Sequence, residues 1–473
     1  MRPRRIRRAL ASVLGVATLT GLALLAVPVH AQVGATDALV SVGSPMGLHP
    51  RNSQNEPALA VDASRTNVLA AGANDLVDMQ PCSQLAAATA SACSFPLGTF
   101  NPGVGLGGVY FSFDSGESWT QPEYTGLTAA GCSPTEEPCT PEVGPIHTVP
   151  NWYEAGLRSR SDPGVAFGPA PGEAGGFSWD NGSRLYYANL ATNLTDTKIG
   201  GGINTSIAIA VSHIDDVTAD RIQDQANWSP PALVTPRSSS TAGFDKEQVW
   251  ADNAASSSFF GNVYVCYVDF HSFSGGAGFP LFPYVATSTD GGDHWASRIV
   301  GPPVANFQRG SRTGCTVRTD SQGTVYAAYA HFGVGTPGMG SHTLIKSVDG
   351  GKHWTRPDEI LPMNDACYFV DPVSGRCTGD GIAGARIDLS AAPSIDIANG
   401  APTGEGATDE IVDGWSDGRA GFNHEQTLLS FSTDGGETWS DPPIVVSEAA
   451  DRSMYSAAAI APGGGTVFVM YMS

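Results

Sequence analysis

The chain has 473 residues, with 46 acidic against 25 basic side chains and a formal net charge of −21. This acidic balance argues against nucleic acid, anionic lipid or another polyanion as a partner, because like charges repel. Beyond the first 31 residues, no segment has the ~18 uncharged apolar residues that a membrane span requires. We therefore expect no membrane partner.

Residues 1–31 are a predicted signal peptide. Five arginines open the segment, an apolar stretch follows to about Val27, and Val29-His30-Ala31 has the small residues of a cleavage site. These residues carry no acidic side chain, so their removal changes the formal charge from −21 to −26. We expect a secreted, extracellular protein in which residues 32–473 form one domain.

Six short segments open repeated units along residues 32–473, and several alternate with the two-residue period of a β-strand. The openings are NEPALAVD from Asn55, SDPGVAFG from Ser161, DKEQVWAD from Asp245, SRTGCTVRTD from Ser311, SAAPSIDIA from Ser390 and SMYSAAAIA from Ser453. A mostly apolar second strand follows each opening, and the first five units add a third strand. The pattern predicts six similar sheets with these openings as their innermost strands.

A turn motif, Ser-x-Asp-x-Gly-x-x-Trp, follows the third strand. Complete copies occupy Ser112–Trp119, Ser288–Trp295, Ser347–Trp354 and Ser432–Trp439, and Ser212–Trp228 has the same ends around a longer interior. In such a turn Ser and Asp hydrogen-bond to the local backbone, glycine tolerates positive φ, and Trp packs on the core. A carboxylate held by its own turn is not free for chemistry. We therefore interpret the four motif aspartates as structural: Asp114, Asp290, Asp349 and Asp434.

These turns resemble the Asp-box (BNR) repeats of the sialidase-like β-propeller superfamily, in particular its secreted bacterial-type members. The resemblance implies an all-β fold, a six-bladed β-propeller with four-stranded antiparallel blades. The last unit stops at Ser473 after its second strand. Either the stretch ALVSVGSP from Ala38 completes that blade, or the chain is truncated relative to a longer parent.

Eight cysteines in an exported chain predict four disulfides rather than redox or metal chemistry. Spacing predicts the pairs Cys82–Cys93, Cys132–Cys139 and Cys367–Cys377, which leaves Cys266–Cys315 to join adjacent blades. No C-x-x-C spacing occurs, so we expect no structural zinc.

The resemblance also implies a site where the innermost strands begin, with a Tyr nucleophile, a Glu that activates it, and an Asp acid/base. The segment MYSAAAIAPGGGTVFVMY from Met454 is similar to the sialidase segment in which Tyr-Ser opens an inner strand. It implies Tyr455 as the nucleophile. Asp75 or Asp78 stands where the acid/base would lie, and Glu247 or Glu56 could activate the tyrosine.

Three arginines of the family hold the substrate carboxylate, since a guanidinium matches it bidentately. The candidates here are Arg312, Arg386 and Arg309, near the openings of units four and five. The chain departs from the family in unit one, where Asn55-Glu56-Pro57 replaces Arg-Ile-Pro. Asp162, Asp245 and Lys246 also lie at strand openings, and such a ring of charges would bind a polar ligand.

Three functions fit this pattern. The first is a secreted exo-α-sialidase-type glycoside hydrolase acting on terminal acidic sugars. The second is a non-catalytic Asp-box propeller that binds glycan or protein, and the third is a two-carboxylate hydrolase of neutral polysaccharide. We expect a glycan or glycoconjugate partner and a monomer. Phosphate-loop, H-E-x-x-H and strand-end G-x-S-x-G motifs are absent, so we expect no cofactor and no metal.

Overall fold

The computed structural model describes the greater part of the chain, in twelve segments. They are residues 38–42, 54–81, 101–133, 139–195, 208–235, 242–271, 279–301, 311–333, 338–367, 369–370, 377–378 and 389–473. The predicted signal peptide lies outside them.

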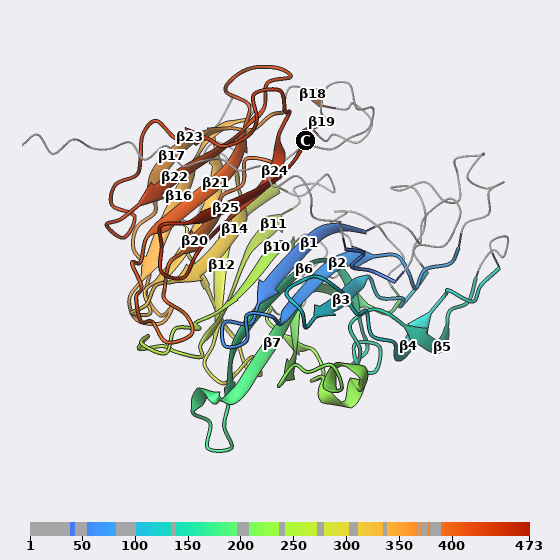
Figure 1. The fold of residues 1–473 in the computed structure, drawn as a ribbon. Coiled ribbons are helices and arrows are strands. Elements are labelled where there is room, and N and C mark those ends of the chain that lie inside the picture. The colour runs from blue at the N-terminus through green and yellow to red at the C-terminus, as the bar shows by residue number, and fades with distance from the viewer. Residues whose placement is uncertain are drawn as a thin grey trace, which may run out of the picture. The chain divides into compact units, whose positions relative to one another are not determined.

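Five antiparallel sheets form the blades of an all-β propeller (Figure 1). Blade one contains β1 (Gln54–Val61), β2 (Leu69–Asp75) and β3 (Gly107–Ser112). Blade two contains β6 (Leu157–Pro171), β7 (Phe177–Asn193), β8 (Ala208–Asp215) and β9 (Ala232–Leu233). Blade three contains β10 (Ala242–Ala251), β11 (Val263–His271), β12 (Phe279–Ser288) and β13 (Ala296–Ile299). Blade four contains β14 (Ser311–Thr319), β15 (Val325–Phe332), β16 (Met339–Ser347) and β17 (Asp358–Asn364). Blade five contains β20 (Ser394–Ile397), β21 (Ile411–Asp417), β22 (Gln426–Ser432) and β23 (Ile444–Val445).

The prediction of six blades is wrong. The sixth opening leads only into a two-stranded hairpin of β24 (Met454–Ile460) and β25 (Val467–Met472). An opening motif marks an inner strand, but a blade needs further strands hydrogen-bonded outward from it. Among the described residues, the inner strand β24 pairs only with β25. The prediction of four-stranded antiparallel blades holds for blades two to five.

The remaining described elements are short. They are the hairpins β4 (Tyr124–Thr128) with β5 (Glu142–Ile146) and β18 (Phe369–Val370) with β19 (Cys377–Thr378), and the 3₁₀ turns η1 (Arg221–Gln223) and η2 (Gln225–Asn227). Neither turn has the length and hydropathy needed to cross a membrane, and no other helix occurs in the described segments. Residues 38–42 form no strand, and the Val42 amide donates to Gln121 Oε1.

The six inner strands lie side by side in chain order, from β1 through β6, β10, β14 and β20 to β24. Apolar side chains fill the space between adjacent blades, because the central strands are buried on both faces. Tyr187 and Phe111 belong to the cluster between blades one and two, and Tyr267 and Val249 to the next. The core is therefore a series of layers between blades, with the inner strand openings at one end.

The four complete Asp-box turns share one hydrogen-bond pattern. The serine hydroxyl donates to the aspartate and accepts a hydrogen bond from the amide of the motif's glycine, four residues after the serine. The Trp indole donates to the carbonyl of the same glycine. In the stretched copy, Trp228 is buried and its indole donates to the Tyr124 hydroxyl. Turn hydrogen bonds of this kind fix the link between the third and fourth strands of a blade.

Three of the four predicted disulfides are present, Cys132–Cys139, Cys266–Cys315 and Cys367–Cys377. Cys266 lies on β11 and Cys315 on β14, so this bond joins blades three and four as predicted. The fourth predicted pair, Cys82–Cys93, lies outside the described residues.

Candidate functional site

The inner strands share an unusual backbone feature near their openings. β1, β6, β10, β14 and β24 each contain a shift in strand register, the mark of a β-bulge. In each strand, the first of the two residues inside one such shift has a left-handed φ, between 50° and 64°: Glu56, Asp162, Lys246, Gly314 and Tyr455. Only the fourth is a glycine, and a left-handed side-chain residue is strained. Repetition of this strain at equivalent positions marks the inner strand openings as the candidate site.

Blades one and two meet at this end through Asn74 of β2. Its side-chain amide donates to Glu56 Oε2 at 2.8 Å, and its carbonyl oxygen accepts the Asp162 backbone amide at 2.9 Å. One side chain therefore orients a left-handed residue in each of two blades. This support is what keeps the strained backbone of both residues in place.

Lys246 joins blade three to this pair. Its Nζ lies 2.7 Å from Asp162 Oδ2, 3.6 Å from Glu56 Oε1 and 3.8 Å from Asp245 Oδ1. The Lys246 backbone amide also donates to Asp245 Oδ1 at 2.9 Å. A single ammonium group thus holds carboxylates from three consecutive blades.

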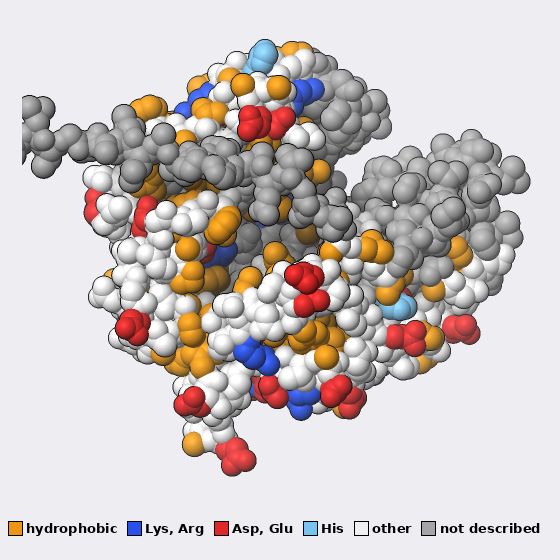
Figure 2. Space-filling model, in the orientation of Figure 1, with side chains coloured by type: hydrophobic (Ala, Val, Ile, Leu, Met, Phe, Trp, Pro, Cys, Tyr) orange, Lys and Arg blue, Asp and Glu red, His pale blue; other side chains and the backbone are white. Residues whose placement is uncertain are grey.

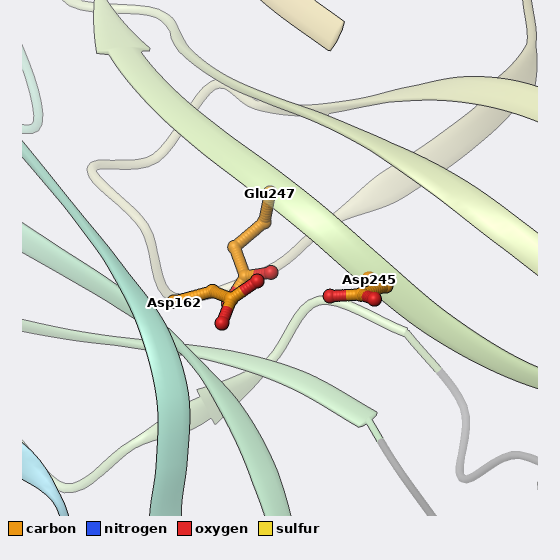
Figure 3. Close-up of side chains that lie close together, drawn as sticks. All are labelled: Asp162, Asp245 and Glu247. Atoms are coloured by element: carbon orange, nitrogen blue, oxygen red, sulfur yellow. The ribbon is translucent and has the colours of Figure 1, made fainter. Parts of the chain in front are cut away.

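Glu247 completes a group that we call the axial cluster: Glu56, Asp162, Asp245, Lys246 and Glu247. Its side chain is only 4% exposed, and neither carboxylate oxygen has a hydrogen-bond partner within the described part of the chain. One oxygen each from Asp162, Asp245 and Glu247 lies within 4.8 Å of the other two (Figure 3). Three of the four carboxyl groups contact the Lys246 ammonium, and Glu247 lies beside Asp162 and Asp245 instead.

Burial and crowding shift the pKa values in this cluster. Burial, together with the charges of Asp162 and Asp245, raises the pKa of Glu247 well above its ordinary value, and burial raises that of Glu56 to about 7 against the opposing Lys246 charge. Burial likewise raises the pKa of Asp245 to about 6. For Asp162, burial acts upward but the Lys246 charge and hydrogen bonds outweigh it, so its pKa falls below the ordinary range. Environments that push carboxyl pKa values apart are typical of acid/base sites.

Tyr455, the nucleophile implied by the resemblance, occupies the left-handed position of β24 and is 38% exposed. Asp75 is buried and accepts hydrogen bonds from Tyr110, Gln121 and Gln54 and from the Val77 amide. The bonds fix both of its oxygens. The catalytic roles of Tyr455 and Asp75 stay predictions.

The alternative acid/base, Asp78, is also buried, and it accepts the His147 amide and the Thr148 hydroxyl. Arg312 is buried on β14. Burial raises the pKa of the neighbouring Tyr329 to about 12, and the Arg312 charge opposes that rise. Arg309 and Arg386 lie outside the described residues, so an arginine triad stays a prediction.

Two features of this end escaped sequence reasoning. Asn74 precedes the predicted acid/base Asp75 but is the residue that supports Glu56 and Asp162. Arg452, just before β24, forms an ion pair at 3.0 Å with the buried Glu425. Nothing in the sequence links residues 27 positions apart in this way, whereas the strand openings did point to the cluster residues.

Comparisons with known proteins find structural similarity at low sequence identity. No family model and no curated protein matches the chain. Among solved structures, a Hadza microbial sialidase, Hz136, is 15% identical with a TM-score of 0.47, over 88% of this chain and 63% of that one. A Trypanosoma rangeli sialidase in complex with the inhibitor DANA is 13% identical with a TM-score of 0.42, over 89% and 52%. An ulvan lyase of polysaccharide lyase family PL25 is 11% identical with a TM-score of 0.38, over 85% and 72%. The chain spans less than two thirds of either sialidase, and values this low transfer neither family nor activity.

Proposed function

We propose that this chain is a secreted, carbohydrate-active propeller that hydrolyses an uncharged sugar chain at the axial cluster. The observation that carries the proposal is the convergence of Glu56, Asp162 and Lys246 from three consecutive blades. Hydrolysis of a glycosidic bond by most enzymes needs a pair of carboxyl groups flanking the bond. The Asp-box turns, which resemble those of sialidase-like propellers, and three disulfides typical of exported proteins support the same proposal.

We assign different roles to the two carboxyl groups, Glu56 and Asp162. Glu56 is 35% exposed, so it can reach the oxygen of a leaving group and give it a proton. Asp162 is held by Lys246 at 2.7 Å, which favours its charged form. It would act at the sugar carbon, directly or through water. Lys246 keeps both groups beside one another.

The charge of the site favours an uncharged sugar over an acidic one. The axial cluster holds four carboxyl groups against a single ammonium, and acidic side chains are spread over the face drawn in Figure 2. An anionic sugar would be repelled unless arginines bound it. The position at which the family places its first arginine carries Asn55-Glu56 here.

An exo-α-sialidase is the second candidate. Tyr455 favours it, because this phenol stands at the left-handed position equivalent to Glu56 and is exposed. A Tyr nucleophile can approach an anionic sugar where a carboxylate would be repelled. The two candidate functions differ in the residue that activity requires, which is Glu56 for the hydrolase of an uncharged sugar and Tyr455 for the sialidase.

The test measures release of reducing ends from a panel of neutral polysaccharides and of fluorophore from a sialoside. We expect at least one neutral polysaccharide to be cleaved, and Glu56→Gln to lower kcat/KM by about 10²-fold or more. Tyr455→Phe and the exposed control Glu142→Gln should retain activity. Cleavage of the sialoside that Tyr455→Phe abolishes would replace this proposal with a sialidase. Equal activity of Glu56→Gln and the parent chain would remove Glu56 from the mechanism.

A further inference from the structure

Three carboxylates of the axial cluster form a compact set of oxygen ligands. Asp162 comes from β6, and Asp245 and Glu247 come from β10. Figure 3 shows Glu247 extending from its strand toward the Asp162 carboxylate, with Asp245 pointing its carboxylate toward both. One oxygen of each lies within 4.8 Å of the other two.

Lys246 neutralises only part of this set. Its ammonium lies 2.7 Å from Asp162 and also contacts Glu56 and Asp245, but no residue in the described segments donates to Glu247. A buried carboxylate without a partner is costly, and proteins usually pair such a charge or give it to a metal ion. The 4% exposure of Glu247 leaves bulk water unable to do this.

We propose that Asp162, Asp245 and Glu247 bind one calcium ion. All three ligands are carboxylate oxygens, which hard divalent cations prefer. Oxygens on opposite sides of Ca²⁺ are about 4.6–5.2 Å apart, given its ordinary ligand distances, against about 4.2 Å for Mg²⁺. The three oxygens lie within 4.8 Å of one another, which is inside the range that one Ca²⁺ spans. The ion would give Glu247 the partner it lacks and bring the charge of the cluster from a formal −3 to −1.

Calcium at this position would join blade two to blade three next to the axis. The residues belong to inner strands that already lie side by side, so the ion would add a cross-link where the backbone is strained at Asp162 and Lys246. This inference goes beyond the proposed hydrolysis, because it concerns binding and stability and holds whether or not Glu56 acts on a sugar.

The test titrates Ca²⁺ into the chelator-treated full chain by calorimetry and measures Tm with and without Ca²⁺. We expect saturable binding to the parent chain, weaker binding of Mg²⁺, and a Tm that rises with Ca²⁺ because only the folded chain binds. Glu247→Gln should weaken Ca²⁺ binding by at least about tenfold, since it removes one charged ligand. The control variant Glu142→Gln, at an exposed residue outside the axial cluster, should change the Ca²⁺ affinity by less than about twofold.

Two further variants keep the result interpretable. Without Ca²⁺, Glu247→Gln should fold with a Tm equal to or above that of the parent, because it removes a desolvated acid. Asp245→Asn should also weaken Ca²⁺ binding. Glu56→Gln should leave Ca²⁺ binding intact even where it abolishes hydrolysis, so the two proposals can fail separately. Absence of Ca²⁺ binding at millimolar concentration, or equal binding by Glu247→Gln, would overturn the inference.

Discussion

His342 is the most completely enclosed histidine of the described residues, and it links blades four and five. Its Nδ1 lies 2.6 Å from Asp413 Oδ2 and its Nε2 lies 2.8 Å from the Ala391 carbonyl oxygen. Both partners offer oxygen atoms, so with Asp413 ionised both ring nitrogens can donate, as they do in the charged imidazolium. Burial opposes this charge, but Asp413, with smaller contributions from Ala391 and Asp417, outweighs burial and raises the pKa of His342 above 6.5.

This histidine predicts a pH dependence of stability. Because the folded-state pKa is raised, the contribution is fully present below about pH 6.5, the unfolded value, and is lost as pH rises through the folded pKa. In urea unfolding between pH 5 and 9, His342→Gln should lose this slope and about 3–5 kcal/mol of stability at low pH, since it leaves the buried Asp413 carboxylate without its cation. His331→Gln, on the same sheet but partly exposed, is the control. Parallel pH profiles for parent and His342→Gln would contradict the assignment.

At the scale of the element, the Asp-box turn shows how side chains determine a connection. Ser347 donates to Asp349 Oδ1 at 2.9 Å and accepts the Gly351 amide at 2.9 Å. Gly351 has φ +84°, and a Cβ there would lie 2.5 Å from Thr287 Oγ1 of blade three. The glycine is therefore required both by its backbone conformation and by the close approach of the neighbouring blade.

Ser347→Ala should destabilise the protein by about 1–3 kcal/mol, because the buried Gly351 amide loses its acceptor. The adjacent Val348 is 77% exposed, and Val348→Ala should change stability by less than about 0.5 kcal/mol. Chemical denaturation of both variants measures the difference. If the two variants were equally stable, the serine hydroxyl would not hold the turn.

At the scale of the molecule, contacts between blades hold the propeller together. The long hairpin of β6 and β7 contacts the connections of two other blades, where the Trp179 indole donates to the carbonyls of Asn253 and Pro402. Asn253 lies in the connection between β10 and β11 of blade three, and Pro402 in the connection between β20 and β21 of blade five. Side-chain layers between adjacent blades and the Cys266–Cys315 bond add to this contact.

The disulfide between blades should contribute substantially to stability. It closes a loop of 49 residues, for which the loss of chain entropy in the unfolded state corresponds to about 4 kcal/mol. The double variant Cys266→Ala/Cys315→Ala should therefore unfold at a lower Tm and lower denaturant concentration. Cys132→Ala/Cys139→Ala, which opens a loop of 7 residues in an insertion, should cost less. The reverse order would show that the link between blades is not the important one.

The sequence by itself determined what short segments encode. Ser347, Asp349 and Gly351 form their turn from neighbouring residues, the inner strands follow the two-residue period, and close cysteine spacing predicted Cys132–Cys139 and Cys367–Cys377. These features depend on local hydrogen bonds and loop lengths, so a pattern reveals them.

The tertiary structure decided the number of blades and the composition of the axial cluster. Whether an opening such as Ser453 starts a blade depends on how many strands pair outward, which no local motif records. Glu56, Asp162 and Lys246 are separated by 106 and 84 positions, and they meet only because the blades bring the inner strands together. The absence of a partner for Glu247 is equally a property of that packing. Charged groups that are distant in the sequence interact strongly only when the fold brings them together and removes the water between them.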